Sequence, residues 1–272
     1  MKRRPPSQPA TSWDAVAARD NATWYLDPVV AKQKRDVHLR LIREWMPQGA
    51  QVALKTDLFE EAFGKDELLT DLSRLVPTWI AIDVSARMVQ RAAVRKASPR
   101  AFYVAADARS LPLRARCLDI VVSTSTLDHF GTRAEFEQAI VELVSVLRPG
   151  GHLIVTVDNP SNPLYPLLRW LSRWGPFPLG YTPKAAELNR ILERAGLQVT
   201  ATKTLIHNPR ILSSGLFLAL RHTLRAHADR PIEWLLAMFA AMDCLPTRRF
   251  TACFLAARAV RRPVPDCGSC SV

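Results

Sequence analysis

The sequence predicts an α/β protein built on a doubly wound, seven-stranded, mostly parallel sheet with helical lid insertions. One observation is that short apolar runs alternate with segments of helical periodicity through the middle of the chain. A second is that two of these runs lead into a single aspartate, Asp83 or Asp107. In addition, 272 residues with 48% hydrophobic content suffice to bury the core of one such domain.

The chain before the sheet is predicted to be a short tail followed by helices. Residues 1–12 are proline-rich, and we expect them to be disordered. Helical periodicity follows at 13–19 and 28–45, and it ends at Pro47 and Gly49.

The central part of the predicted sheet lies in residues 50–158. Helical patterns such as 133–146 separate its strands, and this alternation is typical of a parallel sheet. The strands are expected near residues 51–56, 78–83, 101–106, 118–123 and 151–157.

Two more strands complete the predicted sheet near its C-terminal end. A helix at 184–195 ends at Gly196, and the sixth strand follows it at 197–206. The seventh strand is expected at 250–260 and antiparallel to its neighbours.

Two insertions interrupt this pattern where an active site of such a sheet would open. Residues 159–182 combine a proline-rich turn with a short helix that carries two tryptophans, and residues 207–249 are mostly apolar helix. We therefore predict one domain over 13–260, with N-terminal helices at 13–49 and a flexible tail at 261–272.

Asp83 and Asp107 are predicted to form part of a nucleoside site. Open α/β sheets bind ligands beyond the carboxyl ends of their strands. There one carboxylate can accept both hydroxyls of a ribose, and a carboxylate one strand further on can accept from an adenine amino group. The alternative is that the two aspartates cap the helices that follow them.

The pieces around these aspartates fall in a characteristic order. After Asp107 come Leu111-Pro112-Leu113, a buried strand at 117–123, Leu127-Asp128-His129-Phe130 and a strand from Leu147 to Asp158. This series resembles the class I S-adenosylmethionine (SAM) dependent methyltransferases, especially the small-molecule branch related to ubiquinone methyltransferases, over residues 50–158. The resemblance implies SAM as cofactor, and Val84, Ala108 and Thr124 belong to the predicted cofactor site beside the two aspartates.

The turn after the first strand departs from that family because it lacks the glycines that let a backbone approach the cofactor. Only Gly64 is present, so we expect this loop to follow another path. In place of glycines stand Lys55, Thr56 and Asp57, where the lysine would meet the methionine carboxylate of SAM and the aspartate its ammonium group. Alternatively, Lys55 and Asp57 pair with each other or cap a helix that begins near Asp66.

His129 is the predicted general base because an unperturbed imidazole titrates near neutral pH. Asp158, at the end of the fifth strand, would orient His129 or bind an acceptor hydroxyl. The alternatives are that His129 donates to a carbonyl at a helix start and that Asp158 caps the turn at Asn159. Tyr165 and His207 are weaker candidates from the two insertions.

Composition excludes several other classes of function. The net charge of +12 comes mainly from scattered arginines without a basic patch interleaved with aromatics, so nucleic-acid binding is disfavoured. Neither metal-ligand spacing nor a Gly-x-Ser-x-Gly motif is present, and we predict no metal. Five cysteines without a disulfide framework, and no signal peptide, favour the cytoplasm, and the pair Cys267 and Cys270 is expected in a frayed tail.

The apolar insertions, together with Trp24-Tyr25, have three interpretations. They hold a lipophilic acceptor, form a homodimer interface, or lie on a membrane surface where arginines meet anionic headgroups. The predicted function is SAM-dependent methyl transfer to a small hydrophobic or amphiphilic acceptor, with oxygen favoured as the acceptor atom. The alternatives are a non-catalytic cofactor-binding or partner-binding protein and a SAM-using enzyme with a non-transfer reaction.

Overall fold

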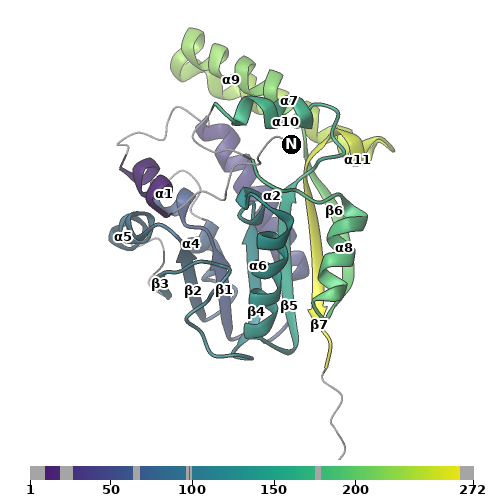
Figure 1. The fold of residues 1–272 in the computed structure, drawn as a ribbon. Coiled ribbons are helices and arrows are strands. Elements are labelled where there is room, and N and C mark those ends of the chain that lie inside the picture. The colour runs from purple at the N-terminus through teal and green to yellow at the C-terminus, as the bar shows by residue number, and fades with distance from the viewer. Residues whose placement is uncertain are drawn as a thin grey trace, which may run out of the picture.

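A single seven-stranded sheet, in the order β3-β2-β1-β4-β5-β7-β6, runs through the middle of the molecule (Figure 1). The computed structural model describes residues 10–18, 27–63, 68–95, 98, 100–174 and 179–263. The strands are β1 Val52–Thr56, β2 Thr78–Asp83, β3 Ala101–Ala105, β4 Leu118–Thr124, β5 Leu147–Asp158, β6 Leu197–His207 and β7 Ala252–Arg261. Only β7 is antiparallel to its neighbours, which confirms the predicted doubly wound sheet.

Three elements differ from their predicted boundaries by two residues or more. Helix α1 (Ala10–Ala17) begins inside the segment expected to be disordered. Strand β5 begins at Leu147 because Leu147 already pairs with Leu118 of β4. Strand β7 begins at Ala252 because the preceding residues Arg248–Thr251 form the short helix α11.

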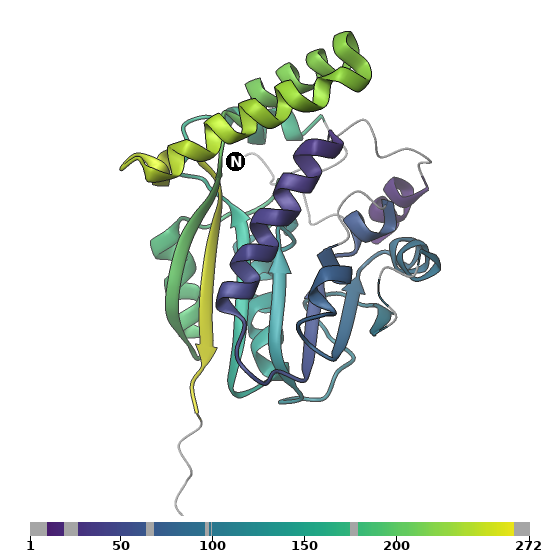
Figure 2. The same cartoon turned by 180° about the vertical axis from the view of Figure 1, so that it is seen from behind.

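Helices cover both faces of the sheet. One face is covered by α2 Pro28–Trp45, α3 Phe59–Phe63, α4 Leu68–Leu72 and α5 Ala86–Val94. The other face is covered by α6 Arg133–Val146 and α8 Ala185–Arg194. Figure 2 shows α2 lying across the first of these faces, and Figure 1 shows α6 and α8 in front of the second.

Local sequence explains where the best defined helices start. At α2, Asp27 accepts a hydrogen bond from the backbone N–H of Val29 at 2.8 Å, and proline occupies the first turn. At α6, Thr132 and Glu135 form a reciprocal capping box, and the buried side chains then recur with helical spacing. This confirms the helix predicted at 133–146.

A further set of helices lies beyond the carboxyl ends of the parallel strands (Figures 1 and 2). It comprises α7 Tyr165–Ser172, α9 Arg210–Leu224, α10 Asp229–Ala240, α11 and the short turns η2 Arg225–Ala228 and η3 Ala241–Cys244. We call residues 165–174 and 210–251 the helical layer. Across the described ranges, no helix combines the length and the apolar character needed to cross a membrane.

Candidate cofactor and acceptor site

A cavity of about 330 Å³ opens at the carboxyl ends of β1, β2 and β4. The strand order reverses between β1 and β4, and such switch points are where open α/β sheets bind ligands. Ten of the twelve candidate residues predicted from the sequence line this cavity: Lys55, Thr56, Asp57, Asp83, Val84, Asp107, Ala108, Thr124, His129 and Asp158. The fold therefore brings together residues that lie up to about a hundred positions apart in the chain.

Asp57 gives the glycine-poor turn a conformation that glycine usually supplies. Its φ is 73°, in the left-handed region where aspartate is among the better tolerated non-glycine residues. Its carboxylate accepts from the backbone N–H of Phe59 at 2.9 Å, so the side chain caps the start of α3. The turn thus has a positive φ without a glycine, and the cap is at Phe59 instead of near Asp66, a residue outside the described ranges.

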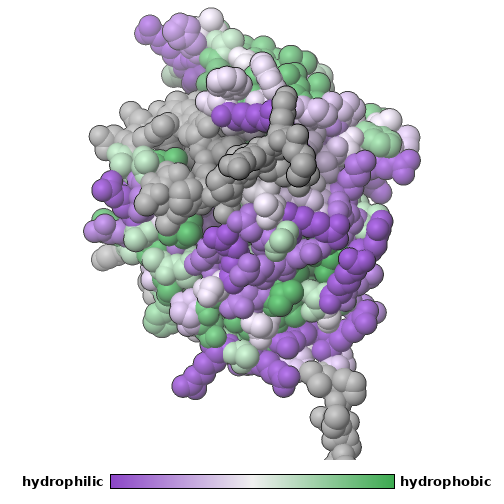
Figure 3. Space-filling view, in the orientation of Figure 1, coloured by the Kyte–Doolittle hydropathy of each residue, from purple (hydrophilic) through white to green (hydrophobic). Residues whose placement is uncertain are grey.

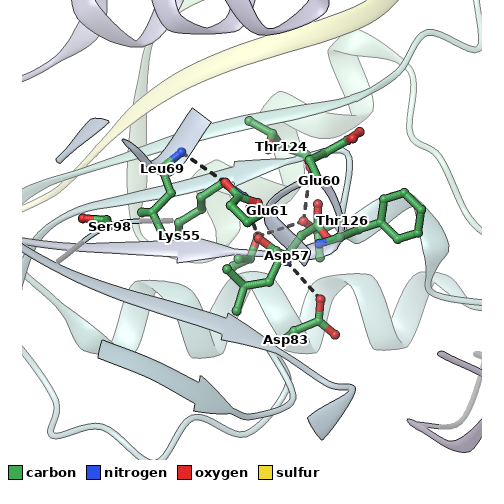
Figure 4. A network of polar contacts seen from close by, with 12 residues as sticks. Lys55, Asp57, Glu60, Glu61, Leu69, Asp83, Ser98, Thr124 and Thr126 are labelled. Atoms are coloured by element: carbon green, nitrogen blue, oxygen red, sulfur yellow. Dashed lines mark hydrogen bonds and ion pairs between the residues drawn. The ribbon is translucent and has the colours of Figure 1, made fainter. Parts of the chain in front are cut away.

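Lys55 is buried, and its side chain stabilises the same turn. Its ammonium donates to the carbonyl oxygen of Asp57 at 2.6 Å and to the carboxylate of Glu61 at 3.1 Å (Figure 4). Glu61 is fully buried and also accepts from the backbone N–H of Leu69. Burial raises the pKa of Glu61, and the Lys55 charge opposes that rise. Lys55 thus pairs with the Asp57 backbone and with Glu61, while its predicted contact with the cofactor stays a prediction.

Asp83 joins the end of β2 to the turn after β1. One carboxylate oxygen accepts from the backbone N–H of Ser85 at 2.8 Å, and the other accepts from Leu58 at 3.0 Å. The cap of α5 is Ser85 and not Asp83, since the Ser85 hydroxyl accepts from Met88. Burial, helped by the nearby Asp57 carboxylate, raises the pKa of Asp83 to about 7. Hydroxyl donors reaching this carboxylate would favour its ionised form.

Asp107 is held by a residue that sequence reasoning did not identify. The Arg109 guanidinium donates to both carboxylate oxygens, with an Nη2–Oδ2 distance of 2.6 Å, and the Arg109 backbone N–H donates as well. Partial burial acts in the opposite direction, but the Arg109 hydrogen bonds outweigh it and hold the pKa of Asp107 below its usual range. Arg109 also pairs with Glu135 at 2.8 Å and lies over the Phe130 ring.

His129 stands on a short 3-10 turn, η1 Leu127–His129, directly after β4. Its backbone N–H donates to the Thr126 carbonyl, and its ring meets the edge of Trp13 from α1 at 5.2 Å between centroids. The Thr126 hydroxyl lies 2.8 Å from that of Thr56, which links this turn to β1. Trp13, like His129, lines the cavity.

A hydrogen bond joins two buried aspartates, Asp128 on η1 and Asp158 at the end of β5. The backbone N–H of Asp158 donates to Asp128 Oδ2 at 2.9 Å, and the two residues are 2% and 1% exposed. Both line the cavity. The sequence analysis named Asp128 only as part of the segment that contains His129, so its contact with Asp158 was missed.

The other two candidates from the insertions are not part of the described cavity wall. The Tyr165 hydroxyl donates to Thr182 at 2.8 Å, and burial raises its pKa to about 12. His207 lies against Thr251 and Asp243. These contacts are typical of packing within the insertions.

His38 on α2 is a cavity residue that the sequence analysis did not single out. It is buried, its Nδ1 lies 2.8 Å from the Lys34 carbonyl, and its ring packs edge-on against Phe254 of β7. Burial, together with the Lys34 charge, lowers the pKa of His38 to about 4, so the ring is neutral at physiological pH. The available signal was a histidine on the apolar face of α2, in register with Ile42 and Trp45.

Cysteines and potential metal ligands add nothing further to this site. In the described part of the chain, no group of three or more His, Cys, Asp or Glu side chains is arranged to hold a metal ion. Cys117, Cys244 and Cys253 are free thiols. The pair Cys267 and Cys270, Gly64 and the Trp24-Tyr25 pair all lie outside the described residues.

Comparison with known proteins identifies the family. A model described as "Methyltransferase domain" matches residues 60–155, beginning just after the glycine-poor turn. A probable S-adenosylmethionine-dependent methyltransferase of Mycolicibacterium smegmatis is 31% identical over 197 residues, which cover 67% of this chain and 68% of that protein. The chain belongs to the S-adenosylmethionine-dependent methyltransferase family. Membership of its ubiquinone-related branch stays a prediction.

Solved structures resemble this methyltransferase in fold. The N-methyltransferase NodS from Bradyrhizobium japonicum, in complex with S-adenosyl-L-homocysteine, has a TM-score of 0.57 at 19% identity, covering 93% of this chain and 97% of that one. The [4+2]-cyclase SpnF has a TM-score of 0.59 at 17% identity, covering 96% and 100%. At these identities the likeness establishes a shared Rossmann-like fold.

SAM is the cofactor of this methyltransferase, and the residues of the cavity fit it. The half-buried Asp83 carboxylate lies at the end of β2, where it is placed to accept from hydroxyl groups. Ile82, Val84, Ala106 and Ala108 supply apolar wall between Asp83 and Asp107, as a flat aromatic base requires.

Proposed function

We propose that this methyltransferase transfers a methyl group from SAM to an oxygen atom of a small hydrophobic or amphiphilic acceptor. One observation carries the proposal: the cavity that contains Asp83 and Asp107 is also lined by His129, by Asp158 and by five large apolar side chains. These apolar residues are Trp13, Phe130, Leu168, Leu179 and Phe254. A cavity that combines polar groups with large apolar side chains suits an acceptor that has both a reactive polar group and an apolar part.

Five of the residues predicted for the cofactor site have an assigned role. We assign the ribose hydroxyls to Asp83, the adenine amino group to Asp107, and the methionine end to the turn at Lys55, Thr56 and Asp57. The Arg109 clamp on Asp107 supports this assignment, because it keeps the carboxylate ionised and fixes its orientation.

The acceptor half would supply proton removal and orientation. SAM, when bound, supplies a methyl group activated by a positively charged sulfur. We assign to His129 the removal of the acceptor hydroxyl proton as the oxygen–carbon bond forms and the sulfur–carbon bond breaks. Asp158 would orient His129 for this step, since the single hydroxyl proton passes to His129. The edge contact of Trp13 restricts the orientation of the His129 ring, which favours one direction of approach for the acceptor hydroxyl.

The test uses purified protein, SAM and a panel of alkylated phenols with matched anilines and thiophenols. We expect SAM to raise the melting temperature, and S-adenosylhomocysteine to accumulate with the phenols and to increase with alkyl chain length. Turnover confined to anilines would overturn the choice of oxygen. SAM-dependent stabilisation without S-adenosylhomocysteine from any acceptor would favour a binding protein or a non-transfer reaction.

A cytoplasmic location is part of the same proposal. The three cysteines in the described ranges are free thiols, as is usual in a reducing compartment. SAM is also made and consumed inside cells, so the cofactor would be at hand there.

A further inference from the structure

The helical layer carries most of the apolar surface that the described residues expose. Twelve of the fifteen exposed large hydrophobic side chains lie in it, although it comprises only residues 165–174 and 210–251. They are Leu167, Trp170, Leu171, Trp174, Leu212, Leu216, Leu218, Leu224, Trp234, Met238, Leu245 and Phe250. Figure 3 shows hydrophobic residues gathered over α9 at the top of the molecule. Exposed apolar surface of this extent marks an interaction site.

The two long helices of this layer are apolar on two sides. Their inner sides are buried in a small core around Phe217 and Ile232, which packs against Val29 of α2. Their outer sides expose Leu212 and Leu216 on α9, and Trp234 and Met238 on α10, each pair spaced by four residues. A helix that packs on the protein with one side and is also apolar on its outer side has a second surface suited to burial against an apolar partner.

The charge of the helical layer distinguishes between the possible partners of this apolar surface. It contains eight arginines and no lysine, against three carboxylates. Asp229 already pairs with Arg221 at 2.7 Å, and Asp243 lies against His207. In a two-fold dimer, this surface would pack against the same surface of the second copy. The excess arginines of one copy would then repel those of the other. An anionic lipid surface offers apolar chains and negative headgroups together.

Helix α7 connects this surface with the cavity. Leu168 and Ser172 line the cavity from α7, whereas Leu167, Trp170 and Leu171 of the same helix are exposed. Tryptophan is enriched where protein meets the boundary between headgroups and acyl chains. Helix α7 therefore forms part of the cavity wall and part of the exposed apolar surface.

We propose that the helical layer docks on an anionic lipid bilayer, with its helices lying in the plane of the interface, so that a lipophilic acceptor enters the cavity past α7. The entry of the acceptor rests on the proposed function, whereas the docking itself stands without it. Docking of this kind needs no membrane-spanning helix and depends on salt, because arginine–headgroup attraction is screened.

The test is co-sedimentation of the full chain with phosphatidylcholine vesicles that do or do not contain phosphatidylglycerol. We expect binding to the anionic vesicles that weakens as salt is added. Trp234→Ala/Met238→Ala should lower the partition coefficient by about tenfold or more. The matched control is Val94→Ala/Val141→Ala, which removes side chains that are 75% and 58% exposed outside the helical layer and should leave it unchanged.

The charge contribution has its own pair of variants. Arg225→Ala/Arg230→Ala should lower partition roughly fivefold per arginine, whereas Arg114→Ala/Arg190→Ala, with equal loss of charge elsewhere on the surface, should lower it less. Equal effects of the two pairs would mean that only net charge matters and would overturn the docking surface.

Three further outcomes also decide the proposal. Absence of vesicle binding, or binding that Trp234→Ala/Met238→Ala leaves intact, would overturn it. So would a dimer, measured by light scattering, that the same variant dissociates. Because these measurements need neither cofactor nor acceptor, a methyltransferase that turns over phenols without binding vesicles would refute docking alone. SAM affinity of each variant, measured by calorimetry, checks that the fold is retained.

Discussion

Asp83 at the end of β2 accepts a hydrogen bond from the backbone N–H of Leu58 at 3.0 Å, and this contact fixes the turn after β1 against the neighbouring strand. The same carboxylate is the predicted partner of the ribose. We therefore expect cofactor affinity and the shape of the turn to depend on this one half-buried side chain.

The raised pKa of Asp83 predicts a pH-dependent affinity for SAM. The pKa is about 7 in the free protein, and hydroxyl donors stabilise the ionised form, so protonation must be reversed before the ribose binds. We expect calorimetry to show SAM binding about tenfold weaker at pH 6 than at pH 8. Asp83→Asn should bind SAM weakly and without this pH dependence, and an unchanged slope in that variant would assign the titration to another group.

Asp57 provides a test of backbone strain in the glycine-poor turn. At φ 73°, glycine would relieve strain, whereas alanine would keep it, and both lose the hydrogen bond to Phe59. Asp57→Gly should therefore be more stable than Asp57→Ala by about 1–2 kcal/mol in denaturant unfolding. Equal stability of the two variants would contradict the left-handed conformation.

The buried pair of Lys55 and Glu61 predicts an unequal response to removing either partner. Glu61→Gln leaves a buried ammonium beside a neutral amide and should destabilise the protein by roughly 3–5 kcal/mol. Lys55→Met should lower the free energy of unfolding less at pH 5 than at pH 8. Burial already raises the pKa of Glu61, so its carboxyl can become neutral at the lower pH. Unfolding free energies at pH 5 and pH 8 test this, and equal losses at both pH values would argue against the pair.

His38 predicts a loss of stability in acid. Its pKa is lowered to about 4 in the folded protein from an ordinary 6.5, so the unfolded chain takes up the proton first. Lowering the pH from 7 to 5 should therefore cost the wild type about 2 kcal/mol more than His38→Gln, which has no such titration. Parallel stability curves for the two proteins would show that His38 is not buried in neutral form.

His129 predicts a loss of turnover without a loss of cofactor. Removing a general base typically lowers the rate by about 10²–10⁴-fold. His129→Ala should show this decrease in S-adenosylhomocysteine production while SAM affinity, measured by calorimetry, stays within about twofold. His152→Gln on β5, outside the cavity, is the matched control. Full turnover by His129→Ala would remove His129 from the mechanism.

Much of the fold and of the site was predictable, because both follow from local pattern and from strand ends. The strand at 78–83 and the helix at 133–146 were predicted at their observed boundaries. The positions of Asp83 and Asp107 were predictable too, because parallel strands deliver their carboxyl ends to one edge.

The missed residues depend on contacts that the sequence does not encode locally. Glu61 becomes the partner of Lys55 only because α3 folds back over β1. Trp13 reaches His129 across more than a hundred residues, and His38 meets the cavity only through the packing of α2 on the sheet. Arg109 is an exception, since its position two residues after Asp107 was visible in the sequence.

The left-handed Asp57 changes what a sequence signature of such proteins has to contain. What the turn requires is a dihedral angle, and glycine is one way of meeting that requirement, while aspartate with its side chain bonded to the next amide is another. Searches that demand glycine at this place will pass over proteins of the same architecture. A signature that admits aspartate or asparagine there, followed two residues later by a helix start, would recover them.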